Sequence, residues 1–138
     1  MILLQKQLAV KKSTIPGSGK GLFTKKFIAK GARIIVYKGK ITTWKKVQQQ
    51  TTFNGYIFYI NRNRVIDGKN YIKSLGRYAN DAKGITKIKG LRNNCRYEVE
   101  NNEVFIIATT DIDKGSEILV AYGKDYWDVI RYNKKLGL

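Results

Sequence analysis

The chain has 138 residues and a formal net charge of +17 at pH 7, with 27 Lys and Arg, 10 Asp and Glu and no His. Its length fits one domain of residues 1–138, and a hydrophobic content of 43% excludes a generally disordered chain. With no His and a single Cys, the sequence excludes His-based catalysis, an internal disulfide and a zinc site, and no metal is expected.

The positive charge is concentrated in the first half of the chain. Residues 1–66 contain 14 Lys and Arg and no acid, whereas residues 67–138 contain 13 Lys and Arg and 10 acids. One interpretation is an electrostatic surface for nucleic acid or another polyanion; the other is a solvated, lysine-rich surface. No apolar run approaches the ~18 residues of a membrane span, and residues 1–12 are too polar for a signal peptide. An intracellular protein of the cytoplasm, nucleoid or nucleus is therefore predicted.

In the first half, alternating apolar residues predict short strands separated by glycine-containing turns. Strands are expected at 8–12, after the turn at 15–20, and at 33–38, 55–60 and 64–66. Thr43 is a candidate N-cap for a short helix in WKKVQQQ, and Asn70 is a candidate N-cap for helical turns at 74–78.

In the second half, a polar loop with several glycines precedes two strands, at 95–100 and 103–109. Asn101 and Asn102 between them form a two-residue hairpin turn of the kind that needs positive φ. A strand at 117–121 follows and ends at Gly123, and apolar residues of the tail at 128–138 have roughly helical spacing. So many short strands with little helix predict a compact, mainly β arrangement of several small sheets.

Two local features allow both a structural and a chemical interpretation. Tyr122, at the end of the last strand, is either a core aromatic with a capped hydroxyl or a group held out for chemistry. Gly17, Gly19 and Gly21 alternate, so the backbone there either makes a plain turn or approaches a ligand closely. No helical pattern or GK[ST] follows, which excludes a dinucleotide fingerprint and a P-loop.

Five segments, taken in order, resemble the SET-domain protein lysine methyltransferases. They are GSGKGLF at 17–23, the strand at 33–38 with Tyr37, SLGRYANDA at 74–82, NNC at 93–95 and ILVAYGKDYW at 118–127. The resemblance spans residues 8–127 and leaves a short tail at 128–138. The family members that the chain resembles are small ones without cysteine-rich pre-SET or post-SET regions. It implies the SET-domain β-clip of several small sheets, closed by a C-terminal pseudoknot.

The same resemblance implies an enzyme that transfers a methyl group from S-adenosylmethionine to a lysine of a protein and releases S-adenosylhomocysteine. Tyr122 takes the position of the family's catalytic Tyr. The residues implied to line the lysine channel are Tyr37, Tyr97 and Tyr126. The residues implied to bind the cofactor are Ser18, Gly19, Lys20, Gly21, Asn80, Asp81, Tyr122 and Trp127.

The sequence departs from the family's motif at two adjacent positions. Asp81 stands where the family usually has His, and Ala82 stands where it has Ser. The loop at 83–92, between the two halves of the motif, is extended by about ten residues. A carboxylate would therefore lie near the expected adenine site.

The implied partner is a protein with a target lysine, for example a histone or a DNA-associated protein, and the protein is expected to be a monomer or homodimer without membrane contact. Because histone tails are basic, docking one would require an acidic groove. The candidate acids are Asp67, Asp81, Glu98, Glu100 and Glu103. The alternative is a catalytically silent module on the same fold, whose basic first half binds nucleic acid or an acidic protein.

Overall fold

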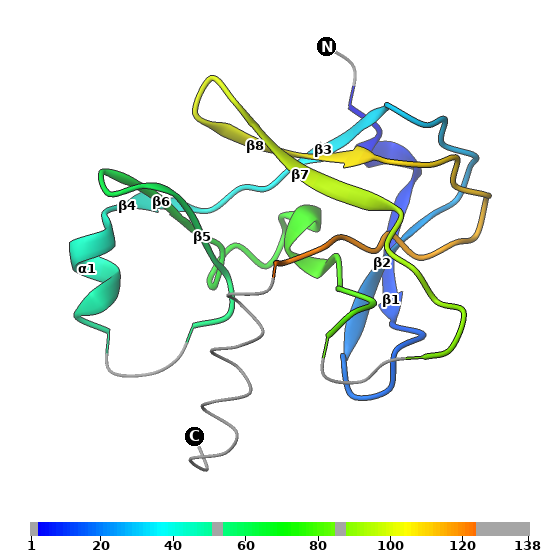
Figure 1. The fold of residues 1–138 in the computed structure, drawn as a ribbon, viewed down its shortest axis with the longest axis horizontal. Helices are drawn as coiled ribbons and strands as arrows, with labels where there is room; N and C mark the ends of the chain where they lie inside the picture. The colour runs from blue at the N-terminus through cyan, green and yellow to red at the C-terminus, as the bar shows by residue number, and fades with distance from the viewer. Residues whose placement is uncertain (1–2, 51–53, 85–87, 124–138) are drawn as a thin grey trace.

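The computed structural model describes residues 3–50, 54–84 and 88–123, and its strands form three small antiparallel sheets (Figure 1). In spatial order these contain β1 (Leu8–Lys12) and β2 (Lys20–Thr24); β3 (Arg33–Val36), β8 (Glu103–Ala108) and β7 (Cys95–Glu100); and β4 (Lys40–Thr42), β6 (Arg64–Asp67) and β5 (Ile57–Asn61). The helical segments are η1 (Gln5–Gln7), α1 (Trp44–Gln48) and η2 (Leu75–Tyr78). The predicted mainly β fold is confirmed. Among the described residues, no helix is both long and apolar enough to cross a membrane.

Local sequence signals fix several turns and caps. The hydroxyl oxygen of Thr43 accepts a hydrogen bond from the Lys46 N–H at 3.3 Å, which confirms the predicted helix cap. Asn101 and Asn102 have φ of 52° and 63°, which confirms the two-residue turn between β7 and β8. The strand predicted at 33–38 ends earlier, at Val36, and β4, which the sequence did not predict, begins at Lys40 and pairs with β6.

The helical segment predicted at 74–78 is the 3-10 turn η2, and the prediction that Asn70 caps it is wrong. η2 begins after Ser74, and separate turns precede it, since Tyr71 N donates to Gly68 O at 3.1 Å and Ser74 N to Tyr71 O at 2.9 Å. A Cβ added to Gly76 would lie 3.1 Å from the Val36 carbonyl oxygen, so glycine lets η2 pack closely against the end of β3.

The segment at 117–121 forms no regular strand, contrary to the prediction. Glu117 pairs with Phe23 in an antiparallel bridge, whereas Leu119 pairs with Asn80 and Val120 with Cys95 in parallel bridges. Because these partners come from three separate parts of the chain, no continuous ladder forms. Residues 117–120 are nevertheless buried, whereas Ala121 is exposed.

Residues 117–120 pass between two other segments, 79–82 and 93–95. On one side Val120 N donates to Asn80 O at 2.8 Å, and on the other Cys95 N donates to Leu119 O at 2.9 Å. Asn93 connects the two flanking segments, since its Oδ1 accepts a hydrogen bond from Ala82 N at 2.8 Å. The last described part of the chain thus passes through a loop closed behind it, the pseudoknot that the resemblance implies.

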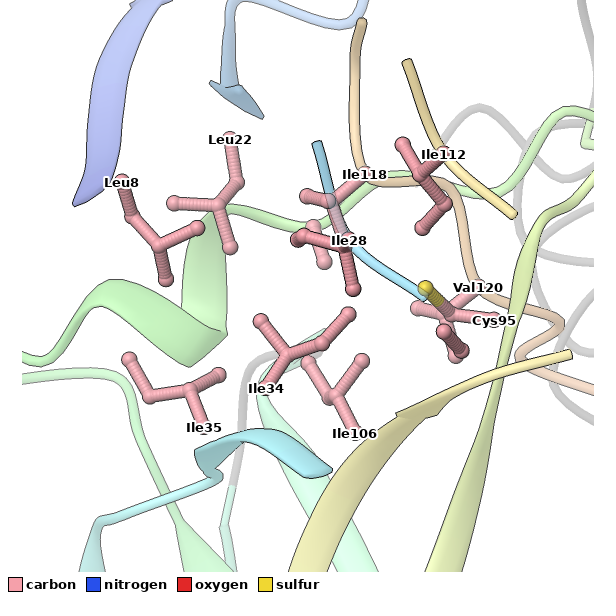
Figure 2. Packing of buried hydrophobic residues seen from close by; sticks show 12 residues of the cluster. Leu8, Leu22, Ile28, Ile34, Ile35, Cys95, Ile106, Ile112, Ile118 and Val120 are labelled. Atoms are coloured by element: carbon pink, nitrogen blue, oxygen red, sulfur yellow. The ribbon is translucent and has the colours of Figure 1, made fainter. Parts of the chain in front are cut away.

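A hydrophobic core joins the β1–β2 and β3–β8–β7 sheets to the threaded segment (Figure 2). Its members come from β1, β2, β3, β7, β8, the threaded segment and positions 28, 79 and 112 outside the strands. Those labelled in Figure 2 are Leu8, Leu22, Ile28, Ile34, Ile35, Cys95, Ile106, Ile112, Ile118 and Val120. Ile118 and Val120 have no exposed surface. Burial of these side chains provides the main driving force that holds the threaded segment in place.

Cys95 gives this core a measurable dependence on pH. Burial raises the pKa of its thiol from an ordinary 9.0 to about 12. Because the folded state keeps the proton more tightly, this contribution to stability is complete below pH 9 and is lost as the pH rises toward 12. Between pH 8 and pH 10 the wild type should lose about 1.4 kcal/mol more unfolding free energy than Cys95→Ala, measured by urea denaturation. Equal losses in the two proteins would contradict a desolvated thiol.

Candidate active site

A cavity of about 540 Å³ opens where the β1–β2 turn, β3, β5, η2, β7 and the threaded segment meet. It is lined by Gly17, Ser18, Gly19, Lys20, Tyr37, Gly55, Tyr56, Ile57, Phe58, Arg77, Tyr78, Asn80, Tyr97 and Tyr122. In Figure 1, η2 lies between the β4–β6–β5 sheet on the left and the β1–β2 sheet on the right. The volume is within the range of small-molecule sites.

The cavity brings together seven of the site residues that the sequence predicts, and their roles remain predictions. These are Ser18, Gly19, Lys20, Tyr37, Asn80, Tyr97 and Tyr122. Gly21 and Asp81 are buried next to the cavity and do not line it. Tyr126 and Trp127 lie outside the described residues.

Aromatic rings form one wall of the cavity. The ring of Tyr97 lies edge-on to those of Tyr37 and Phe58, with centroid distances of 6.2 and 5.0 Å, and stacks on Tyr122 at 6.5 Å. The Tyr37 hydroxyl donates to the Tyr56 carbonyl oxygen at 2.7 Å, which fixes the Tyr37 ring. Only 6% of Tyr37 is exposed. This wall is suited to a slender apolar side chain.

Tyr122 is held at both of its ends by one short segment. Its backbone N–H donates to Asp81 Oδ2 at 2.9 Å, and its hydroxyl donates to the Ala79 carbonyl oxygen. Gly123, immediately after it, has φ of +100°, a backbone conformation that favours glycine. Tyr122 therefore combines both interpretations of the sequence, because its hydroxyl is capped and its side chain also faces the cavity. Having donated its proton, that oxygen can still accept a hydrogen bond.

The glycine turn between β1 and β2 forms another wall of the cavity. Gly17 and Gly19 have φ of +80° and +65°, and a Cβ added to either would meet no atom within 4 Å. Glycine is therefore needed there for backbone conformation, with open space beside it for a ligand.

The buried carboxylate of Glu117 supports this turn from behind. It accepts hydrogen bonds from Ser13 Oγ at 2.7 Å, from Thr14 N at 3.0 Å and from Thr14 Oγ1 at 2.6 Å. Asn80 Nδ2 donates to the same carboxylate at 3.3 Å and to Lys20 O at 3.0 Å. The amide of Asn80 is thereby fixed beside the glycine turn, at the boundary between the two walls.

Sequence reasoning missed several lining residues, of which Tyr56, Phe58 and Arg77 matter most. Tyr56 and Phe58 are two residues apart in the strand predicted at 55–60, and this period of two was the available signal. The Arg77 guanidinium carbon lies 4.1 Å from the Tyr56 ring centroid and 5.3 Å from that of Tyr78. Arg77 Nε is buried, and no described residue accepts a hydrogen bond from it. An acceptor on a bound ligand could satisfy this N–H group.

The acidic groove considered from the sequence does not form at this cavity. Asp81 is buried, Glu98 pairs with Arg96 at 3.2 Å, and Glu100 pairs with Arg33. Among the described residues, the lining contains the cations Lys20 and Arg77 and no acid. Within the described ranges, no group of His, Cys, Asp or Glu side chains is arranged to hold a metal ion.

Comparisons with known proteins agree with this geometry. A family model described as the SET domain matches residues 19–123, well over half of the chain. Among solved structures, the methyltransferase domain of human PR domain-containing protein 2 is similar, with a TM-score of 0.62 and 22% sequence identity over 86% of this chain and 78% of that chain. No curated protein matches the chain by sequence. The matched residues include the glycine turn from Gly19, the η2 segment and the threaded segment that ends at Tyr122, and the chain therefore belongs to the SET-domain family.

Proposed function

We propose that the protein is an S-adenosylmethionine-dependent protein-lysine N-methyltransferase. The observation that carries the proposal is the shared cavity, which is lined both by the glycine turn with Asn80 and by aromatic rings that include Tyr122. Methyl transfer to an amine needs two ligands aligned end to end, and the polar and aromatic parts of this lining offer each ligand a different surface.

The cofactor side of the cavity fits the chemistry of S-adenosylmethionine. Its methionine part carries a carboxylate, which would satisfy the buried, unpartnered Nε of Arg77 and lie near the exposed Lys20. The positive-φ glycine turn leaves the backbone open to close approach, and Asn80 presents an amide beside it. When bound, this cofactor supplies an electrophilic methyl group and a thioether leaving group that departs with the C–S electron pair.

The aromatic wall would accept the lysine and keep its amine neutral. Tyr37, Phe58 and Tyr97 exclude water from the amine, and desolvation lowers the pKa of an ammonium. No carboxylate of the described residues lines the cavity to stabilise the charged form. The substrate ammonium would release one proton to solvent as it enters the cavity, and the lone pair of the neutral amine would then accept the methyl group to give a methylammonium. The hydroxyl oxygen of Tyr122 can accept a hydrogen bond from the amine N–H and so direct its lone pair.

The charge around the site bears on the choice of substrate for an assay. Lys20 and Arg77 line the cavity without a compensating acid. A strongly basic segment around the target lysine would be repelled, so neutral and acidic lysine-containing segments are the proposed substrates.

Replacing Asn80 with Ala is expected to weaken S-adenosylmethionine binding at least about tenfold, since the amide beside the cavity and its bonds to Lys20 O and Glu117 are lost. Calorimetric titration of wild type and variant with S-adenosylmethionine and S-adenosylhomocysteine measures this. The matched control is Asn63→Ala in the exposed β5–β6 turn, which should leave the Kd unchanged. A wild type that binds neither compound would contradict the proposal.

A further inference from the structure

Asp81 stands where the family's motif usually has His. Its buried carboxylate accepts a hydrogen bond from the Tyr122 N–H and does not line the cavity. Only 6% of the residue is exposed. We propose that Asp81 is a positioning residue whose carboxylate fixes the backbone of Tyr122 and thereby the place of the Tyr122 hydroxyl. The proposal rests on the proposed function, because the hydroxyl is taken to orient the target amine.

Three consecutive residues, 79–81, contact Tyr122 and the glycine turn. The Ala79 carbonyl oxygen accepts a hydrogen bond from the Tyr122 hydroxyl, and Asp81 Oδ2 accepts one from the Tyr122 N–H at 2.9 Å. Between them, Asn80 points to the glycine turn through its bond to Lys20 O. The segment 79–81 therefore sets both the cofactor wall and Tyr122 from one backbone, so that displacing the Asp81 contact moves the hydroxyl relative to the methyl donor.

Only a group that accepts hydrogen bonds at both oxygens satisfies this environment. Asp81 Oδ1 accepts from Lys83 N and from Asn93 Nδ2, each at 2.8 Å, while Oδ2 accepts from Tyr122 N. An amide has one accepting oxygen, and its NH₂ group would face a donor in either orientation. Asp81→Asn therefore keeps the size of the side chain and breaks at least one of these contacts.

Asp81 could instead serve only to hold segments 79–82 and 93–95 together, and a variant of Asn93 tests this alternative. Asn93 also joins segments 79–82 and 93–95 through its bond from Ala82 N, without contacting Tyr122. Asn93→Ala thus removes the brace but leaves the bond between Asp81 and the Tyr122 N–H. It is the matched control, since both variants are expected to lower the melting temperature.

The experiment compares wild type, Asp81→Asn and Asn93→Ala by turnover, by calorimetric Kd for S-adenosylmethionine and by amide hydrogen exchange. Asp81→Asn should lower kcat about 100-fold with the Kd within about threefold, since a displacement of about 1 Å costs that much in rate. Asn93→Ala should keep kcat within about threefold of wild type. The Tyr122 amide should exchange faster in Asp81→Asn and remain protected in Asn93→Ala.

Equal losses of kcat in the two variants would overturn the proposal and leave Asp81 a brace. A Tyr122 amide that stays protected in Asp81→Asn would also overturn it, whether or not the wild type is active. A wild type that binds no cofactor and methylates nothing removes the proposed function, while the exchange measurement still decides the contact. If Asp81→Asn does not fold, Asp81→Glu replaces it, because the longer side chain keeps the charge and displaces the oxygen. Its kcat should fall at least about tenfold, and an unchanged kcat would overturn the proposal.

Discussion

Replacing Tyr122 with Phe is expected to lower the rate of methyl transfer about 100-fold and to leave the Kd for S-adenosylmethionine within about threefold. The substitution removes the hydroxyl that Ala79 holds in place, and with it the oxygen that would orient the lysine amine. The ring remains stacked on Tyr97, so the aromatic wall and the fold are retained. Single-turnover transfer of labelled methyl groups to a lysine-containing protein measures the rate without interference from product release.

The control for this experiment is Tyr59→Phe. Tyr59 lies on β5, is 49% exposed, and packs edge-on against Trp44 outside the cavity. It should transfer methyl groups at the wild-type rate. A Tyr122→Phe protein as fast as this control would show that the hydroxyl does not contribute to transfer, and the assignment of Tyr122 would then fail.

Replacing Gly21 with Ala is expected to lower the free energy of unfolding by about 3 kcal/mol, because the added methyl group overpacks a buried region. Its Cβ would lie 2.3 Å from Glu117 Oε2 and 3.2 Å from Ser13 Cα. The carboxylate cannot move aside freely, since Oε2 also accepts hydrogen bonds from Ser13 Oγ and Asn80 Nδ2. Cofactor binding should weaken with stability, since the same carboxylate supports the glycine turn. Urea denaturation and calorimetry measure the two effects.

Gly19→Ala provides the matched comparison on the same turn. A Cβ there meets nothing within 4 Å, and the cost comes only from its φ of +65°, about 1 kcal/mol. If Gly21→Ala proved no more destabilising than Gly19→Ala, the close packing of Gly21 against Glu117 would be refuted.

Features set by neighbouring residues could be predicted from the sequence. The Asn101–Asn102 turn and the Thr43 cap depend on conformations and hydrogen bonds within a few residues, and both are confirmed. The sequence predicts a regular strand at 117–121, and the structure has none there, although residues 117–120 are buried. The bridges of this segment go to Phe23, Asn80 and Cys95, and no local pattern encodes which distant segments will meet.

The candidate site divides in the same way. The motif order identified the cavity's glycine turn, Asn80 and Tyr122, because the spacing of a family motif is itself a record of three-dimensional proximity. It did not show that the carboxylates of Asp81 and Glu117 turn inward, because their partners at Tyr122, Ser13 and Thr14 are far away in the sequence. The motif order also missed Tyr56 and Arg77. The Tyr56 ring and the Arg77 guanidinium meet only when the start of β5 packs against η2.

The threaded arrangement of residues 117–120 has a consequence for how the protein reaches its working form. The loop that surrounds this segment is closed by contacts between residues 79–82 and 93–95, and the segment must enter it late, since it follows both along the chain. Contacts between such distant positions are slow to form because the entropy of closing the intervening chain is lost first. A ribosome-bound chain that ends before Leu119 therefore lacks part of the cavity lining. A ligand that binds only the threaded state will raise the population of that state by mass action, so such a ligand should favour completion of the knot.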